Sequence, residues 1–286
     1  MSDPTSPITD STDAESAPDY KLHRRWDRLA RLTSDAGMQR LQNAFVAVIG
    51  LGGVGSFAAE SIVRSGVGRM RIVDFDESCV TNSNRQLHAM KGSIGRPKAA
   101  LLGERFALIN PQAVIEPIKA FYSEETADAL LAGNPDFVVD AIDNVTAKCH
   151  LIATCKARGI PLVTCLGAAG RWDPSLIRVA DLNRTRNCRL GVAVRDILRQ
   201  KFGFPKTGPW GITAVFSEEF VQAPHPLAYD GEDGFKCVCP QGQNGLFECD
   251  RRNRIDGSAS FVTGACGLFA ASVVVKALAQ GTRPHA

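Results

Sequence analysis

The residues of this chain best suited to chemistry surround a short glycine-rich turn. The stretch VIGLGGVGS contains Gly50, Gly52 and Gly55 in the pattern G-x-G-x-x-G, with Gly53 between them, directly after an apolar run. Glycines let a backbone approach an anion closely, and a helix that starts at such a turn favours negative charge. Asp74 ends the next apolar run and is placed to bind a ribose hydroxyl. The pattern predicts a bound nucleotide, and by itself it fits NAD as well as ATP.

A second group of polar residues distinguishes these two nucleotides. The stretch DFDESCVTNSNRQLH supplies Asp76, Asn82, Arg85 and Gln86, and Lys98 opens the amphipathic stretch that follows. Arginine can bind a triphosphate through two parallel hydrogen bonds and lysine adds a point charge. A nicotinamide enzyme has little use for such a group beside its phosphate loop. The group therefore favours ATP, and a surface cluster of ion pairs is the structural alternative.

A candidate ligand for a divalent cation follows a later apolar run. In FVVDAIDN, Asp143 comes shortly after a stretch that has almost no polar interruption. Carboxylate oxygens suit Mg²⁺, which usually keeps only one or two protein carboxylates beside the phosphates of its substrate. The alternative role for Asp143 is a helix cap. The sequence thus predicts an ATP site with Asp143 as its metal ligand.

The elements that must position these residues alternate along the chain. Strands separated by amphipathic helical stretches are predicted at 44–50, 69–76, 113–121, 137–142 and in PLVTCLG. This order predicts an α/β fold, a Rossmann-like, doubly wound and mostly parallel sheet with a mixed C-terminal extension. Ligands of such sheets bind beyond the carboxyl ends of the strands, so the glycine turn, residues 74–76 and residues 142–144 should converge on one crevice.

Two details qualify this order of elements. Pro117 indicates an edge strand or a bulge within 113–121, because proline cannot donate to a sheet. After about residue 170 the alternation fades, and loops rich in Arg, Gly and Pro are expected to take over.

Composition is ordinary for a soluble globular protein, with 44% hydrophobic and 22% charged residues among 286. Residues 1–20 hold five acidic residues and no Lys or Arg, and they are predicted to form a disordered tail. Residues 21–286 then form one domain, with a nucleotide-binding core over 21–170 and substrate-facing loops and a terminal helix over 171–286. The tail has no basic start and no apolar core, so we expect a cytoplasmic protein with reduced cysteines.

One apolar segment qualifies the expectation of a soluble protein. Residues 261–279, FVTGACGLFAASVVVKALA, are nearly long enough to span a bilayer. Lys276 interrupts the segment, while Gly264, Ala265 and Gly267 suit close helix packing. A buried terminal helix is the favoured interpretation, and membrane contact is the alternative.

The ordered set GLGGVGS, VDFD, TNSNRQ, Lys98 and DAIDN resembles the adenylating enzymes related to ubiquitin activators, over about residues 25 to 170. The resemblance implies that ATP adenylates a carboxylate. It places Asp74 on the ribose, Asp143 on Mg²⁺, and Asn82, Arg85, Gln86 and Lys98 on the phosphates.

The same resemblance implies a homodimer. The stretch RWDRLARL is similar to the segment whose arginine reaches the ATP of the partner subunit. Arg28 is the candidate, and Arg25 and Arg31 are alternatives.

Three further stretches, RQLHA, GAAGRWDPSLIRVADL and DGSASFVTGACGLFAASVVVKAL, resemble one branch of that family, the bacterial dehydratases of threonylcarbamoyladenosine in tRNA. The resemblance implies that tRNA carrying threonylcarbamoyladenosine is the substrate, that its threonyl carboxylate is adenylated, and that internal attack then closes a ring. Such dehydratases often carry a cysteine near RIDGSAS, where this chain has Gly257, so that thiol is expected to be dispensable. A monovalent cation and a cysteine-desulfurase or other sulfur-transfer partner stay open.

Basic residues agree with a nucleic-acid substrate. From Arg171 to Lys206 there are nine basic residues against three acidic ones, and DRRNR (250–254) forms a second basic cluster. Clusters of this kind neutralise phosphates and supply salt-sensitive affinity for RNA. An ordinary solvated face is the alternative.

The cysteines bear on the main competing function, an adenylating activator of a ubiquitin-like sulfur-carrier protein. Such activators bind zinc with two C-x-x-C pairs, and this sequence has none. Cys237, Cys239 and Cys249 have a different spacing, and a zinc site completed by His225 or Cys188 stays open. Cys188 in RTRNCRL is expected to lie in a mobile loop and to have no catalytic role. The glycine turn also fits an NAD-dependent oxidoreductase, and the basic residues also fit a non-catalytic RNA-binding protein.

Overall fold

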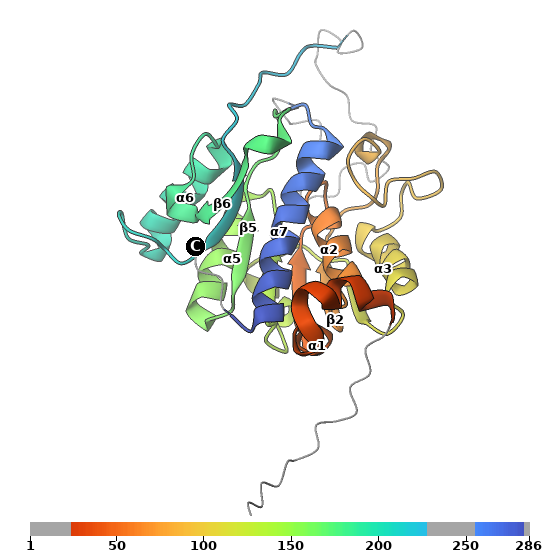
Figure 1. The fold of residues 1–286 in the computed structure, drawn as a ribbon. Coiled ribbons are helices and arrows are strands. Elements are labelled where there is room, and N and C mark those ends of the chain that lie inside the picture. Colours follow the sequence, from red (N-terminus) through yellow and green to blue (C-terminus); the bar gives the residue numbers. More distant parts are fainter. Residues whose placement is uncertain (1–23, 228–254, 283–286) are drawn as a thin grey trace, which may run out of the picture.

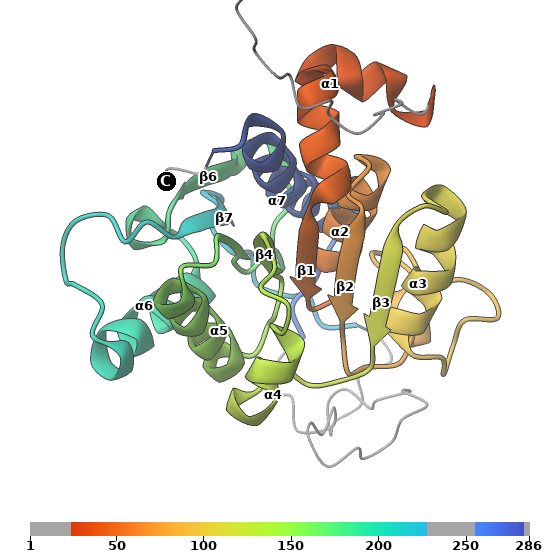
Figure 2. The ribbon, with the colours of Figure 1, turned by 90° about the horizontal axis from the view of Figure 1, so that it is seen from below.

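A seven-stranded sheet forms the centre of the computed structural model, which describes residues 24–227 and 255–282. Its spatial order is β3-β2-β1-β4-β5-β7-β6, and all neighbours are parallel except the antiparallel pair β6 and β7 (Figure 2). The α/β, doubly wound, Rossmann-like fold with a mixed C-terminal part is therefore confirmed. The strands are β1 (Phe45–Ile49), β2 (Arg69–Val73), β3 (Val114–Ile118), β4 (Phe137–Asp140), β5 (Leu162–Cys165), β6 (Ile177–Asp181) and β7 (Thr213–Ser217).

Helices cover both faces of this sheet (Figures 1 and 2). One hydrophobic cluster joins the sheet to α1 (Asp27–Asn43), α2 (Gly55–Arg64), α3 (Lys98–Ile109) and α7 (Ser260–Gln280). A second cluster joins the other face to α4 (Glu124–Leu130), α5 (Val145–Arg158) and α6 (Arg189–Phe202). The short 3₁₀ helices are η1 (Arg24–Trp26), η2 (Val80–Asn82), η3 (Pro174–Leu176) and η4 (Leu182–Arg184).

The structure refines the sequence-based elements at two places. The strand that contains Pro117 lies at the sheet edge and pairs only with β2, so the edge prediction is confirmed. The expectation of loops after residue 170 is wrong, because β6, α6 and β7 continue the sheet and its cover. β6 and β7 are five-residue strands beside the parallel sheet, and their short runs are hard to recognise in a stretch rich in arginine.

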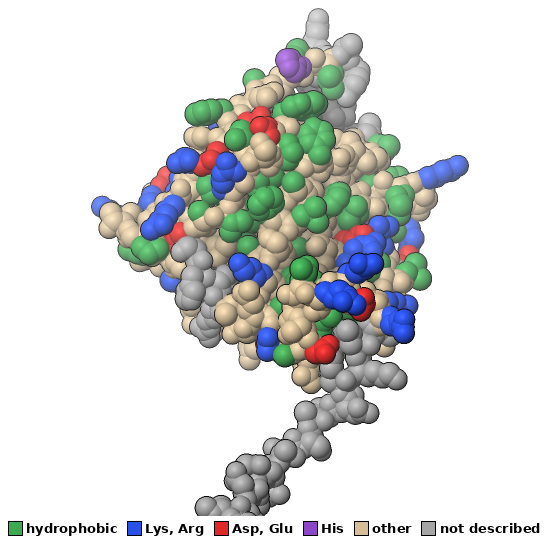
Figure 3. Space-filling view, viewed as in Figure 1, with side chains coloured by type: hydrophobic (Ala, Val, Ile, Leu, Met, Phe, Trp, Pro, Cys, Tyr) green, Lys and Arg blue, Asp and Glu red, His purple; other side chains and the backbone are tan. Residues whose placement is uncertain are grey.

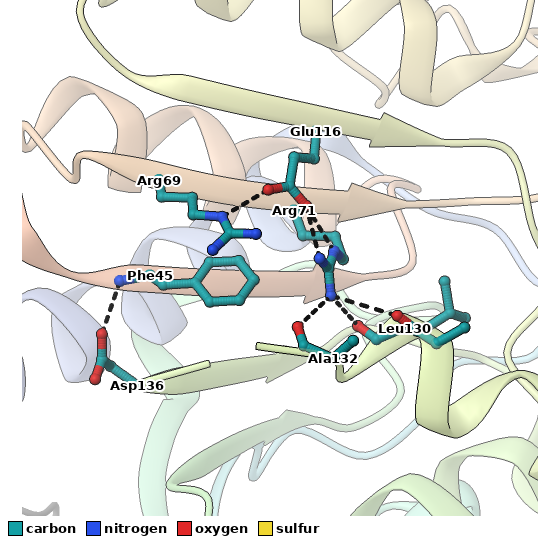
Figure 4. Close-up of polar contacts among 8 residues, drawn as sticks. Phe45, Arg69, Arg71, Glu116, Leu130, Ala132 and Asp136 are labelled. Atoms are coloured by element: carbon teal, nitrogen blue, oxygen red, sulfur yellow. Dashed lines mark hydrogen bonds and ion pairs between the residues drawn. The ribbon is translucent and has the colours of Figure 1, made fainter. Parts of the chain in front are cut away.

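A polar cluster ties α4 to the edge of the sheet (Figure 4). Arg71 of β2 is buried and donates to the carbonyl oxygens of Leu130 (3.0 Å) and Ala132 (2.8 Å) at the end of α4. Such carbonyls have no partner inside the helix and carry partial negative charge. Glu116 of β3 pairs with both Arg69 and Arg71; its burial opposes ionisation, but these two hydrogen-bonded arginines lower its pKa overall.

A second buried pair lies beneath the carboxyl ends of the central strands. Lys148 of α5 and Asp140 of β4 are fully buried, and their Nζ and Oδ2 atoms are 2.7 Å apart. The ammonium also donates to Thr164 Oγ1 and to the carbonyl of Cys165, while Ile142 donates its backbone N–H to Asp140. Because every charge here has several partners, the pair fixes α5 against β4 and β5.

The terminal segment forms helix α7, whose inner face packs closely on α2. A Cβ atom on Gly267 would lie 2.4 Å from the Val54 carbonyl oxygen, and one on Gly264 would lie 3.1 Å from the Phe57 ring. These two glycines therefore serve helix packing, as expected. By length and composition α7 is the one helix among the described residues that could cross a membrane, and half of its apolar window is buried within the protein. The predicted tail over residues 1–20 lies outside the described residues.

We expect Lys148→Met to lower the free energy of unfolding by about 3–5 kcal/mol, because it leaves the Asp140 carboxylate buried without its ammonium. The measurement is urea unfolding followed by circular dichroism. Arg158→Met is the matched control, since its pair with the exposed Asp128 is worth less than about 1 kcal/mol. Equal losses in the two variants would contradict this account of the pair.

Candidate functional site

A cleft of about 570 Å³ opens where the carboxyl ends of β1, β2, β4 and β5 meet. It confirms the predicted convergence of the glycine turn, residues 74–76 and residues 142–144 on one crevice. The sequence-predicted residues that line it are Gly50, Gly52, Gly53, Asp74, Asp76, Asn82, Arg85, Gln86, Lys98 and Asp143. Gly55 and Arg28 do not line it.

Three of the four glycines at the turn have different physical roles. Gly50 has φ +92°, and a Cβ there would lie 2.6 Å from the Ala141 carbonyl oxygen. A Cβ on Gly55 would lie 1.8 Å from the Gly50 carbonyl oxygen, so Gly55 lets the first turn of α2 pack on the end of β1. Gly52 faces open space, and its nearest neighbour would be Gln86 Nε2 at 3.8 Å. Gly52 is therefore the glycine whose missing side chain leaves room in the cleft.

Asp74 is held in place by the backbone around the turn. Its Oδ2 accepts from the N–H of Leu51 at 2.6 Å and its Oδ1 from the N–H of Asp76 at 2.8 Å. Burial raises the pKa of Asp74, and this effect outweighs the opposing charge of Lys98. The carboxylate is thus fixed at the cleft wall with both oxygens oriented.

Lys98 is a buried ammonium surrounded by carboxylates. Its Nζ donates to Asp76 Oδ2 at 2.8 Å. Burial lowers the pKa of Lys98, but the charges of Asp74, Asp76 and Asp143 outweigh burial and raise that pKa overall. Lys98 therefore stays protonated at the floor of the cleft.

The segment around η2 brings three predicted polar residues to the cleft lining. Asn82 accepts from the N–H of Cys79 through Oδ1 at 3.1 Å. Arg85 donates from Nη1 to the Thr81 carbonyl and to Asn84, both at 2.9 Å. Gln86 is buried, and its Oε1 has no hydrogen-bond partner in the described structure. This last atom is a polar group that a ligand in the cleft can satisfy.

The predicted ranges 74–76 and 142–144 include Phe75 and Ile142, but sequence reasoning missed Ala120, Phe121 and the apolar character of this end of the cleft. Phe75 and Phe121 line it and meet edge to face with ring centroids 5.2 Å apart, beside Ala120 and Ile142. These residues follow three different strands, β2, β3 and β4. Their position directly after a strand is the one sequence signal that could have placed them at the cleft. Together they form a wall suited to a flat aromatic base.

A second wall was also missed, and it comes from later in the chain. The lining residues there are Cys165, Leu166, Gly167, Ala168, Ala169, Leu190, Ile255, Asp256, Ser258 and Thr263. The N–H of Gly170 donates to the Gly257 carbonyl at 2.7 Å, which ties the segment before α7 to the loop after β5. The small residues of that loop leave space beside the glycine turn.

The structure corrects the expectation for Cys188 and reduces the number of basic residues available to a ligand. Cys188 is buried, and its Sγ accepts from the N–H of Gly191 as the cap of α6, so it does not lie in a mobile loop. Arg171 is buried and donates to the carbonyls of Gly167 and Asn187. Arg178 and Arg186 both pair with Glu218. The span 171–206 is thus partly structural. Its exposed basic residues are Arg184, Arg189, Lys201 and Lys206, besides Arg178 and Arg186, which pair with Glu218.

The sequence suggested two metal sites, a Mg²⁺ ion at Asp143 and a zinc ion at the cysteines. Among the described residues no group of three His, Cys, Asp or Glu side chains is arranged to hold a metal ion. Asp143 is exposed on the cleft wall as a single carboxylate, which fits a Mg²⁺ ion that takes its other ligands from phosphates and water. Cys237, Cys239, Cys249 and the basic cluster at 250–254 lie outside the described residues.

We expect Gly55→Ala to destabilise the protein by about 3 kcal/mol or more, because its Cβ would overlap the Gly50 carbonyl. Gly52→Ala is the matched control, since its Cβ meets no backbone atom and should cost less than about 1 kcal/mol. Thermal unfolding of both variants measures the difference. Similar midpoints for the two would show that the glycines are not separated in this way.

Comparison with known proteins gives consistent matches. The model of the ThiF family matches residues 26–286. A tRNA threonylcarbamoyladenosine dehydratase of Haemophilus influenzae is 38% identical over 89% of this chain and 93% of its own length. One from Bacillus subtilis is 43% identical over 64% of this chain and 70% of its own length. The crystal structure of the Escherichia coli tRNA N6-threonylcarbamoyladenosine dehydratase in complex with ATP has a TM-score of 0.77 at 33% identity; the match covers 90% of this chain and 94% of that chain.

The family model covers nearly all of the residues after the N-terminal segment, and the first of these relatives matches over almost its whole length. This chain belongs to the ThiF family.

Proposed function

We propose that this protein is an ATP-dependent dehydratase of threonylcarbamoyladenosine in tRNA. It adenylates the threonyl carboxylate, and internal attack on the acyl adenylate closes a ring and releases AMP, after pyrophosphate has left. The observation that carries this proposal is the near full-length similarity to dehydratases of that name, one of them solved with ATP. The cytoplasmic location expected from the sequence belongs to the same proposal.

The cleft offers a position for each part of ATP. The Phe75 and Phe121 wall accommodates the adenine, and the fixed carboxylate of Asp74 accepts from the ribose. The turn at Gly52, with Asn82, Arg85, Gln86 and Lys98, surrounds the phosphates. Hydrogen-bond donors placed in advance around a phosphate lower the barrier without reorganising during the reaction.

The charge of the cleft supports a cation beside ATP. Its described lining holds four carboxylates, Asp74, Asp76, Asp143 and Asp256, but only two cations, Arg85 and Lys98. Such a wall would repel a bare triphosphate. Mg²⁺ held by Asp143 would supply the missing positive charge and polarise the phosphoryl oxygens. The threonyl carboxylate is already a nucleophile near neutral pH, so adenylation needs positioning and charge neutralisation more than a base.

The separation of α1 from the cleft of its own chain supports a homodimer, in which Arg28 of α1 would reach the cleft of the partner. Thr263 near its start lines the cleft, whereas the carbonyl of Ala279 near its end accepts from Arg40 of α1 at 2.9 Å. A helix of this length spans about 30 Å, so α1 lies at the far end of the protein from the cleft (Figure 1).

The outer face of α7 supplies the surface for that dimer. Phe261, Leu268 and Phe269 are exposed, and hydrophobic side chains gather over this helix (Figure 3). Two copies packed antiparallel through this face about a two-fold axis would bring α1 of each protomer toward the cleft of its partner. Arg28, exposed on α1, would then supply the positive charge that the cleft lacks.

The proposal is tested directly with purified protein, ATP, Mg²⁺ and tRNA carrying threonylcarbamoyladenosine, followed by mass spectrometry of the nucleosides. The expected product has lost the mass of one water. An adenylate on the C-terminal Gly-Gly of a ubiquitin-like carrier, with unchanged tRNA, would support the sulfur-carrier activator instead.

We expect Asp143→Ala and Arg85→Ala to lower tRNA-dependent ATP–pyrophosphate exchange by about a hundredfold or more, because each removes charge stabilisation at the phosphates. Thermal unfolding should stay unchanged for Asp143→Ala, since that side chain is exposed. Near-normal exchange in both variants would refute this phosphate site.

We expect Arg28→Ala and Asp143→Ala to complement each other when subunits are exchanged. Half of the dimers in an equal mixture are mixed, and each has one site with both residues, so about a quarter of wild-type activity should return. The measurement is cyclisation of the tRNA nucleoside before and after exchange. If Arg28 acted within its own chain, the mixture would stay inactive.

A further inference from the structure

The proposed reaction has a second step that the phosphate-binding residues do not serve. Ring closure forms a bond between the threonyl carboxyl carbon and an atom of the ureido group, and it breaks the bond from that carbon to AMP. A ureido N–H loses its proton in this step, whichever atom attacks. A carboxylate within reach of that N–H would act as general base, a role worth about 10²–10⁴ in rate.

Several titratable groups of the described cleft lining lie on the nucleotide side of the cleft or stay protonated. Asp74 and Asp76 follow β2 on the nucleotide side, where Asp74 accepts from the N–H of Leu51 in the glycine turn and Asp76 binds Lys98. Burial raises the pKa of both the Tyr122 hydroxyl and the Cys165 thiol far above neutrality, so neither loses its proton. Asp143 faces the phosphates together with Lys98, whose pKa its charge raises.

Asp256 differs from these groups by its position, because it lines the wall beside the small-residue loop after β5. Its neighbour Gly257 accepts from the N–H of Gly170, at the end of that loop. Ser258 accepts from Asn84 Nδ2 at 2.9 Å, beside the segment that carries Arg85. The backbone next to Asp256 is therefore anchored both to the loop that leaves room for the second substrate and to the phosphate-binding segment. Asp256 therefore lines the cleft on the segment that connects these two parts of its wall.

We propose that Asp256 is the general base of ring closure. This inference rests on the proposed function and adds a residue to its second step. The Asp256 carboxylate takes the ureido proton while the new ring bond forms, and AMP leaves with the electron pair of the broken C–O bond. The proton then passes from Asp256 to solvent, so the step needs no further reactant.

The test separates the two chemical steps in Asp256→Asn. With ATP, Mg²⁺ and tRNA carrying threonylcarbamoyladenosine, we expect pyrophosphate exchange within about twofold of wild type and cyclisation at least about a hundredfold slower. The acyl adenylate should accumulate, and hydroxylamine should trap it as a hydroxamate on the tRNA. Asp256→Glu, which keeps the base, should restore part of the cyclisation rate. Asp128→Asn, an exposed aspartate outside the cleft lining, is the matched control and should behave as wild type.

Two outcomes would overturn the assignment of Asp256 while the wild-type protein cyclises its substrate. One is cyclisation by Asp256→Asn near the wild-type rate. The other is a parallel fall of exchange and cyclisation without trapped adenylate, which would place Asp256 in nucleotide binding. A wild-type protein that neither exchanges pyrophosphate nor alters the tRNA would instead refute the proposed function itself.

Discussion

The buried ammonium of Lys98 is the interaction on which the site depends. It joins the start of α3 to the end of β2 through Asp76, and it lies in the field of Asp74 and of Asp143 before α5. Burial alone would favour a neutral lysine, and the surrounding carboxylates reverse that preference. The same carboxylates outnumber the cations of the described cleft lining. This excess of negative charge favours positive charge from outside the chain, so a metal ion and a partner arginine fit the proposal.

The second constraint is the close approach of two backbone segments, the start of α2 and the end of β1, at the glycine turn. Gly55 and Gly50 let α2 start directly against the end of β1, and only glycine leaves room for that contact. Because α2 is placed in this way, Gly267 can bring α7 against the same helix at Val54. The cleft, α2 and α7 are thus one packed unit. The exposed face of α7, the position of α1 and the shared site of the proposed dimer all follow from that unit.

Several arginines of this chain have structural roles. Arg71 satisfies carbonyls at the end of α4. Arg171 binds a carbonyl of its own loop and a carbonyl of the segment before α6, and Arg199 lies over the Trp210 ring at 5.4 Å. A guanidinium has five donors in a fixed plane, two more than a lysine ammonium, and can satisfy several carbonyls at once. A count of basic residues therefore overstates the surface that RNA can contact. The exposed Arg184, Arg189, Lys201 and Lys206 are the better candidates for such contacts.

The order of strands and helices through β1 to β5 could be read from residue types alone, and with it the residues that gather at the cleft. Apolar runs show which segments are buried strands, and parallel topology brings everything that follows those strands to one edge. Asp74, Lys98 and Asp143 could therefore be assigned together although they lie far apart in the chain. Other features became visible only once the chain was folded. The tertiary structure shows that Gly55 serves packing whereas Gly52 faces open space. It also buries Cys188 and Arg171 and places Asp256 at the cleft, on the segment before α7. These outcomes depend on contacts between segments distant in sequence, and no local pattern of residue types encodes such contacts.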